Sequence, residues 1–180
     1  MEKFDGNFRL IDTCDIAPLL AKVRALGEED WGAVDWRQQR FDAHKYTQTI
    51  ELIFDRDFRH ENPTKHAMYD RLDCDAVVGP ILESIADFYT GEGYPVRLLL
   101  VRLLAKGQIP QHVDTGYSLT TARRIHVPVI TNDGVIFTVG GEPRALPPGE
   151  IWEINNTREH SVENKSDQSR VHLIVDWVVT

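Results

Sequence analysis

The segment VRLLLVRLL (96–104) begins the part of the chain that decides the fold. Its short apolar run predicts a buried strand. Turn signals such as NDG (132–134) and PPGE (147–150) separate further short segments that favour strands. These segments are RRIHVPVI (123–130), VIFTVG (135–140), EIWEIN (150–155), HSVEN (160–164) and RVHLIVDWVV (170–179). Because no helical pattern lies between them, we expect antiparallel strands in a sandwich or jelly roll. Pro128 cannot donate a backbone hydrogen bond, so its strand should lie at a sheet edge or carry a bulge.

The first 95 residues have a different pattern. Apolar residues recur at helical intervals over 16–26 and again over 77–89, which predicts two helices. Between them, TQTIELIFD (47–55) is rich in residues that favour a strand. We predict a single domain over residues 1–180, in which helices and strands of residues 1–95 pack on a jelly-roll core formed by residues 96–180.

Composition excludes several classes of protein. The chain has 180 residues, of which 42% are hydrophobic and 27% charged, as in soluble globular proteins. Its net charge of −8 argues against general binding to nucleic acid or anionic membranes. Cys14 and Cys74 have no metal-ligand spacing, which fits a reducing compartment. The start, MEKFDGNFRL, lacks the pattern of a secretory signal, and LLLVRLLA (98–105) is too short to span a membrane. We therefore expect a cytoplasmic protein that binds neither nucleic acid nor membrane.

The segment QHVDTGYSLTTARRIHVPV (111–129) concentrates residues that bind metals and anions. In an extended chain, residues two apart project from one face, so His112 and Asp114 point to the same place. His160, in a later polar stretch, offers a third ligand. Two histidines and one carboxylate form the facial triad of non-haem Fe(II) oxygenases. Each histidine taken alone is also compatible with an ordinary surface or core position.

Two predicted strands each present an arginine and a histidine on one face. Arg170 and His172 alternate with apolar neighbours, and Arg124 and His126 do the same. The planar fork of arginine suits a carboxylate held by two parallel hydrogen bonds. A small dicarboxylate is therefore a natural ligand. The alternative is that these arginines pair with some of the chain's 28 acidic residues on a solvated face.

Several of these segments, from Gly107 to Asp176, together resemble the aspartyl/asparaginyl beta-hydroxylase family of Fe(II)- and 2-oxoglutarate-dependent dioxygenases. The similar pieces, which occur in the family's order, are HVD (112–114), RIHVPVITN (124–132), LPPGEIWEINN (146–156), HSVEN (160–164) and RVHLIVDW (170–177). The resemblance implies a mainly β fold, a double-stranded β-helix of the jelly-roll or cupin-like type. The two predicted helices would flank this core on its N-terminal side.

The resemblance also implies roles for individual residues. His112, Asp114 and His160 would bind Fe(II), and Arg170 would hold the far carboxylate of 2-oxoglutarate. Arg124 and His126 match an R-x-H pair that contacts this co-substrate. The implied reaction uses O2 to hydroxylate a C–H bond of an amino-acid-type substrate, and it releases succinate and CO2. That substrate would be an Asp or Asn side chain in a peptide, or a free amino acid or derivative. No catalytic side chain is expected beyond the metal ligands.

Other interpretations remain open at this point. A cupin-type metal enzyme that does not use 2-oxoglutarate would keep the same fold, and so would a non-catalytic module that binds a small acid. We expect Trp152 to pack in the core, and Asn164 either to orient a ligand loop or to complete a turn. His44, His60 and His66 are expected to be solvated, although FDAHKYTQTI (41–50) could line the substrate entrance.

Overall fold

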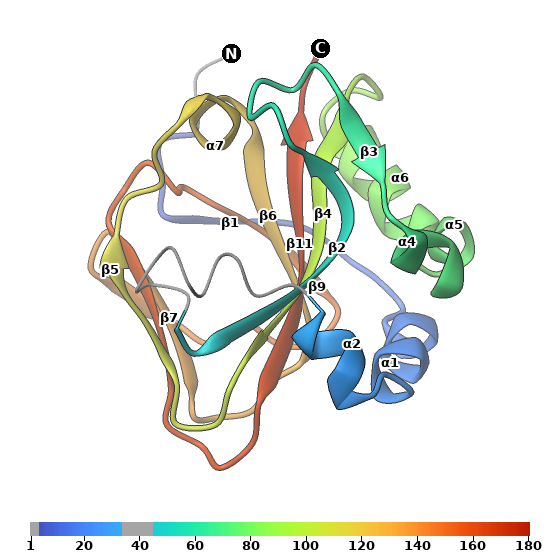
Figure 1. Cartoon of the computed structure of the whole chain (residues 1–180). Coiled ribbons are helices and arrows are strands. Elements are labelled where there is room, and N and C mark those ends of the chain that lie inside the picture. The colour runs from blue at the N-terminus through green and yellow to red at the C-terminus, as the bar shows by residue number, and fades with distance from the viewer. Residues whose placement is uncertain (1–3, 34–44) are drawn as a thin grey trace.

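The computed structural model describes residues 4–33 and 45–180, which form two antiparallel sheets. The larger has the strand order β1-β9-β6-β11-β4-β2-β3 and the smaller β5-β10-β7-β8. The larger sheet contains β1 (Phe8–Thr13), β2 (Thr47–Asp55), β3 (Pro63–Lys65), β4 (Tyr94–Leu103), β6 (Arg123–Ile130), β9 (Glu150–Ile154) and β11 (Arg170–Val178). The smaller contains β5 (Gln108–His112), β7 (Val135–Val139), β8 (Glu142–Arg144) and β10 (His160–Asn164). The two sheets lie opposite each other and do not close into a barrel (Figure 1). Their antiparallel strands and their strand content confirm the prediction of a mainly β, jelly-roll fold.

The two faces of the larger sheet carry different residues. On β4, Leu98 and Leu100 enter the main hydrophobic core, whereas Leu99 and Val101 form a separate cluster with Ile174. Strand β11 alternates in the same way, because Val171, Leu173 and Val175 belong to the main core. Arg124, His126, Arg170 and His172 therefore face the smaller sheet. This confirms the prediction that these arginines and histidines share one side of their strands. Arg123 lies on the other face, beside Glu153.

Helices cover the outer face of the larger sheet. They are α1 (Ala17–Arg24), α2 (Glu28–Gly32), α4 (Ala67–Arg71), α5 (Cys74–Val77) and α6 (Gly79–Phe88), all drawn on one side in Figure 1. Leu19 and Val23 of α1 and Ile81 and Ile85 of α6 enter the main core. A short helix, α7 (Tyr117–Thr121), lies apart from them between β5 and β6. Within the described ranges, no helix is long and apolar enough to cross a membrane.

The first half of the chain also supplies strands. β1, β2 and β3 all precede residue 96, and all three belong to the seven-stranded sheet. β2 pairs directly with β4, and β1 forms an edge beside β9. The predicted strand at 47–55 is confirmed with the same bounds, whereas β1 has no counterpart among the sequence predictions.

Pro128 lies at a bulge. Its strand, β6, lies between β9 and β11 and is therefore not at an edge. The register between β6 and β11 shifts at this point, because Val171 pairs with Ile130 whereas His172 pairs with Pro128. The shift accommodates a residue that cannot donate to the strand ladder. Of the two alternatives that the sequence allowed, the bulge is confirmed.

Leu100 tests the packing between the larger sheet and the helices. It is fully buried in the central strand β4, so Leu100→Ala should lower the free energy of unfolding by about 2–5 kcal/mol. The control, Leu10→Ala, alters an exposed side chain on the edge strand β1 and should change it by less than about 0.5 kcal/mol. Urea denaturation measures both values. Equal effects of the two substitutions would contradict this description of the core.

Candidate active site

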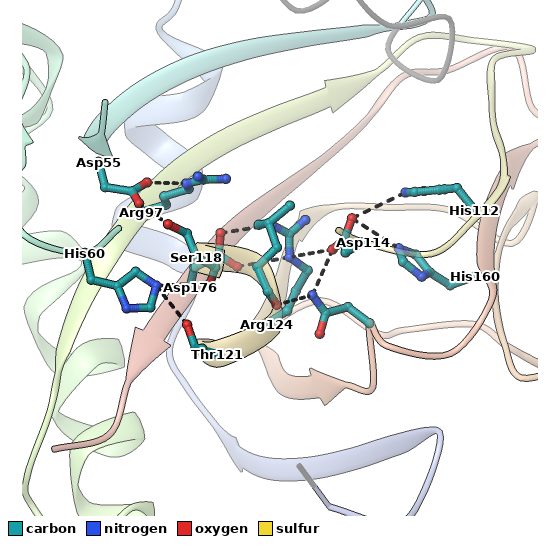
Figure 2. Close-up of polar contacts among 12 residues, drawn as sticks. Asp55, His60, Arg97, His112, Asp114, Ser118, Thr121, Arg124, His160 and Asp176 are labelled. Carbon is teal, nitrogen blue, oxygen red and sulfur yellow. Dashed lines mark hydrogen bonds and ion pairs between the residues drawn. The ribbon is translucent and has the colours of Figure 1, made fainter. Parts of the chain in front are cut away.

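His112, Asp114 and His160 meet at one end of the smaller sheet. His112 ends β5 and His160 begins β10, and the two residues pair directly across the strands. Nε2 of His112 lies 3.6 Å from Oδ1 of Asp114, and Nε2 of His160 lies 4.0 Å from the same oxygen. One ligand atom from each residue lies within 4.8 Å of the others, close enough to share a metal ion. Figure 2 shows the three side chains converging.

Backbone carbonyl groups orient both imidazole rings. Nδ1 of His112 lies 2.8 Å from the carbonyl oxygen of Pro110, and Nδ1 of His160 lies 3.0 Å from that of Arg158. A carbonyl oxygen can only accept a hydrogen bond, so Nδ1 carries the proton in each ring. Nε2 of each ring therefore faces Asp114, and the hydrogen bond to this carboxylate raises the pKa of His112. This is the arrangement that supports metal-ligating histidines in proteins.

Asn156 and Arg124 hold the Asp114 carboxylate in position. Its backbone N–H donates to Asn156 (3.2 Å), and Oδ2 accepts a hydrogen bond from the Asn156 side chain (2.9 Å). Nε of Arg124 lies 3.4 Å from the same oxygen. Burial opposes ionisation, but the positive charge of Arg124 and the contact with His112 hold the pKa of Asp114 well below its usual range. Asp114 is therefore an anion, and its Oδ1 is directed towards the histidines.

Arg124 itself is fixed by a second carboxylate. Its Nε and Nη2 donate to Oδ1 and Oδ2 of Asp176 at 3.0 and 2.9 Å, which makes a bidentate pair. Asp176 lies opposite Arg124 in the ladder between β6 and β11. Arg124 thus connects Asp176 to Asp114, as Figure 2 shows. The sequence suggested Arg124 as a ligand of the co-substrate, whereas the structure places its fork on protein carboxylates.

Arg170, unlike Arg124, has no carboxylate partner among the described residues. It is 1% exposed, and its Nε and Nη1 have no hydrogen-bond partner among the residues that the structure describes. Burial lowers the pKa of Arg170 to about 9, because the charged form loses its hydration. An unpaired buried cation is unfavourable, so this side chain is suited to an anionic ligand.

His126 and His172 lie beside Arg170 on the same face. Their Nδ1 atoms are 3.4 Å apart, so one ring donates to the other. In the described part of the chain, Nε2 of each ring is buried without a partner. Burial and the nearby charge of Arg170 lower the pKa of both histidines well below the usual value. Both rings are therefore neutral in the folded chain.

A cavity of about 490 Å3 joins these groups. Its lining includes the residues singled out from the sequence, namely His112, Asp114, His160, Arg124, His126 and Arg170. Its walls come from both sheets and from α7, so the site lies between the sheets. The volume is in the range of sites for small molecules. The donor set, two imidazoles and one carboxylate facing an open cavity, fits a divalent metal that keeps positions for other ligands.

Two residues of the site were not found from the sequence. Asp176 shares its face with Arg170 and His172, so strand alternation could have identified it. Asn156 gave no such signal, because an amide in a polar loop has many possible roles. Trp152 packs with Ile154 in the core between the sheets, as expected.

Of the remaining sequence candidates, Asn164 completes a turn. Its side chain bonds the carbonyl groups of Leu104 and Gln168 and accepts from Ser166. This supports the second of the two roles considered for it.

The histidines of the first half do not join the metal site. His60 lies 3.2 Å from both the Ser118 carbonyl and the Thr121 hydroxyl. His66 lies 3.6 Å from the Glu51 carboxylate. Both are half-buried rather than fully solvated. His44 lies outside the described residues.

Solved structures share this fold over almost the whole chain. An oxidoreductase of the 2OG-Fe(II) oxygenase family from Burkholderia pseudomallei matches with a TM-score of 0.59 and 16% identity, over 93% of this chain and 91% of its own. AviO1 from Streptomyces viridochromogenes Tue57 has a TM-score of 0.57 and 14% identity, over 96% and 89%. The non-heme monooxygenase ThoJ, as a nickel complex, has a TM-score of 0.57 and 14% identity, over 96% and 74%. At these identities the likeness establishes the fold alone.

A family model gives a narrower assignment. The model for aspartyl/asparaginyl beta-hydroxylases matches residues 80–179, which is more than half of the chain. The chain belongs to the aspartyl/asparaginyl beta-hydroxylase family. It is thus a 2-oxoglutarate-dependent non-haem iron oxygenase that acts as a hydroxylase, which confirms the sequence prediction of family and reaction. No curated protein sequence matches the chain.

The buried histidines predict a dependence of stability on pH. Their folded pKa is lowered, whereas in the unfolded chain it is about 6.5. The stability that they contribute is fully present above pH 6.5 and is lost as the pH falls, because only the unfolded chain then takes up protons. In the metal-free protein, His172→Asn should reduce the loss of unfolding free energy between pH 7 and pH 5 by about 2 kcal/mol. Urea denaturation at both pH values measures this, and an unchanged loss would contradict it.

Proposed function

We propose that His112, Asp114 and His160 bind ferrous iron and that Arg170 binds the far carboxylate of 2-oxoglutarate in the adjoining cavity. The observation that carries this proposal is the meeting, in one cavity, of a three-ligand cluster and a buried arginine with two donors unused within the described residues. Hydrogen bonds orient the rings and the carboxylate, so metal binding requires little rearrangement.

The donor set supports iron. Two neutral imidazoles and one carboxylate, with further positions open, are the preferred ligands of non-haem Fe(II) in oxygenases. His160 suits this role because burial lowers its pKa, so its ring is neutral and free to coordinate. The negative charge of Asp114 is retained because Arg124 and Asn156 stabilise it.

The unused donors of Arg170 support the co-substrate. Arg124 is already paired with Asp176 and Asp114, so a carboxylate entering the cavity finds Arg170 unpaired among the described residues. We propose that His126, with Nε2 free of any described partner, also contacts the co-substrate. Arg124 affects co-substrate binding indirectly, because it holds Asp114 in position.

The residues of the chain contribute binding and orientation to the reaction. When bound, ferrous iron supplies the redox chemistry by which O2 and 2-oxoglutarate are converted to succinate, CO2 and one hydroxyl group on the substrate. Arg170 and the neutral His126 fix the co-substrate, and the walls of the cavity exclude water. No side chain is required to transfer a proton, so we assign no general acid or base. We propose an amino-acid-type substrate.

Substitution of the metal ligands tests the iron site. After anaerobic addition of Fe(II), His112→Ala and Asp114→Ala should each lose stoichiometric iron and at least about 99% of succinate release. Gln111→Ala, which alters an exposed neighbour on β5, is the matched control and should keep both. Iron content and succinate are measured on the same samples. Normal iron and succinate in either ligand variant would refute this site.

Substitution of Arg170 tests the co-substrate site without catalysis. Arg170→Met removes a buried charge that lacks a described partner, so the variant without ligands should melt at the same temperature as the parent or higher. In anaerobic, iron-loaded protein, 2-oxoglutarate should raise the melting temperature of the parent but not of this variant. Arg102→Met, on the neighbouring strand β4, should show the same 2-oxoglutarate shift of the melting temperature as the parent. A full 2-oxoglutarate shift in Arg170→Met would show that the anchor lies elsewhere.

A further inference from the structure

A second buried arginine reaches the cavity at a distance from Arg170. Arg97 on β4 is 4% exposed and lines the cavity. Its Nε donates to Asp55, while its Nη2 is buried and has no hydrogen-bond partner within residues 4–33 and 45–180. Neither the proposed iron site nor the proposed co-substrate site uses this side chain.

Arg97 is held in a fixed position. Asp55 is fully buried and is directed towards both Arg97 and the hydroxyl group of Ser118. The guanidinium group also lies over the rings of Phe54 and Phe58, with 4.8 and 5.1 Å to the ring centroids. These contacts fix the plane of the group while Nη2 remains available. Such an ordered donor binds an anion with little loss of side-chain entropy.

The position of Arg97 separates it from the co-substrate anchor. On β4 it pairs with Asp176 of β11, whereas Arg170 of β11 pairs with Leu103. Six residues separate these two pairs, so the backbone positions lie about 20 Å apart along the strands. A five-carbon diacid held at the metal and at Arg170 therefore leaves Arg97 for another molecule.

The surface between the two arginines is apolar. Leu99 and Val101 alternate with Arg97 on the same face of β4, and they cluster with Ile174 and Phe54. All four residues line the cavity. Arg124, bound to both Asp176 and Asp114, lies between Arg97 and the metal ligands (Figure 2). A molecule with its anionic end at Arg97 would lay an apolar body on this surface as it extends towards the metal ligands.

We propose that Arg97 binds the carboxylate of the primary substrate, and that this substrate is a free amino acid with an apolar side chain rather than a residue within a polypeptide. This inference rests on the proposed function. One available donor beside the Asp55 carboxylate suits a singly charged group better than a phosphate. An internal residue of a polypeptide has no free α-carboxylate for Arg97, and the side-chain carboxylate of an aspartyl residue carries no apolar side chain with it.

The test compares free acids with their amides. The probes are L-leucine, L-isoleucine, L-valine, L-proline and L-phenylalanine, each with its carboxamide, together with a capped peptide that contains an internal aspartate. With the iron-loaded protein and 2-oxoglutarate, at least one free acid should stimulate succinate release at a concentration about tenfold or more below that of its amide. The same acid should raise the anaerobic melting temperature more than its amide does.

Three variants connect this preference to Arg97. Arg97→Gln should raise the KM of the preferred acid about tenfold to a hundredfold and bring the acid-to-amide ratio close to one. Because this change leaves the Asp55 charge buried without its partner, the double variant Asp55→Asn with Arg97→Gln repeats the test in a neutral pair. Arg102→Gln, on the same strand but outside the cavity lining, should keep the full preference. Iron content is measured in each variant so that metal loss is not mistaken for loss of substrate binding.

Three results would overturn the inference. The first is that no acid exceeds its amide in either measurement, and the second is that the capped peptide stimulates as well as the best acid. The third is that the preference survives in both Arg97 variants. Failure of the proposed function is distinguishable, because the parent would then neither bind iron nor consume 2-oxoglutarate. In that case the melting-temperature comparison of acid and amide still tests the Arg97 site alone.

Discussion

The alternation of side chains along β4, β6 and β11 is the constraint on which the rest of the structure depends. One face of these strands is apolar and is covered by helices, and the other carries charged residues into the space between the sheets. A shift of one residue in any of these strands would exchange the two faces. The register between β6 and β11 shifts at Pro128, but Arg124 and His126 precede this bulge, so their alternation is unaffected.

Charge compensation then gives each arginine of the cavity a different role. Arg124 is paired with Asp176 through two hydrogen bonds and also contacts Asp114, so it orients the carboxylate that we propose as a metal ligand. Arg97 is partly paired with Asp55, and Arg170 has no carboxylate partner among the described residues. An uncompensated buried charge is unfavourable. Arg97 and Arg170, which have unused donors among the described residues, are therefore the arginines suited to an anionic ligand. The same residue type therefore serves as a structural clamp at Arg124 and, as we propose, as two distinct anion sites at Arg170 and Arg97.

Much of the fold and of the site could be predicted because the relevant signals are local. Strands such as β10 and β11 have clear period-two patterns, and His112 with Asp114 needs only a short extended segment to converge. Strand β1 was missed because an edge strand with half-buried residues has little apolar pattern. Arg97 has no recognisable signal in the sequence, because its importance depends on Asp55, a residue more than forty positions earlier in the chain.

The sequence by itself determined which residues are available and which face of each strand they occupy, because alternation and motif spacing are properties of adjacent residues. It was enough to predict the jelly roll and the convergence of His112, Asp114 and His160; metal binding by these residues and anion binding by Arg170 are proposals. Only the tertiary structure decided how the charges are paired. Whether Arg124, Arg170 or Arg97 has a free donor depends on carboxylates from other strands, and that pairing exists only once β2, β4, β6 and β11 are aligned in the larger sheet.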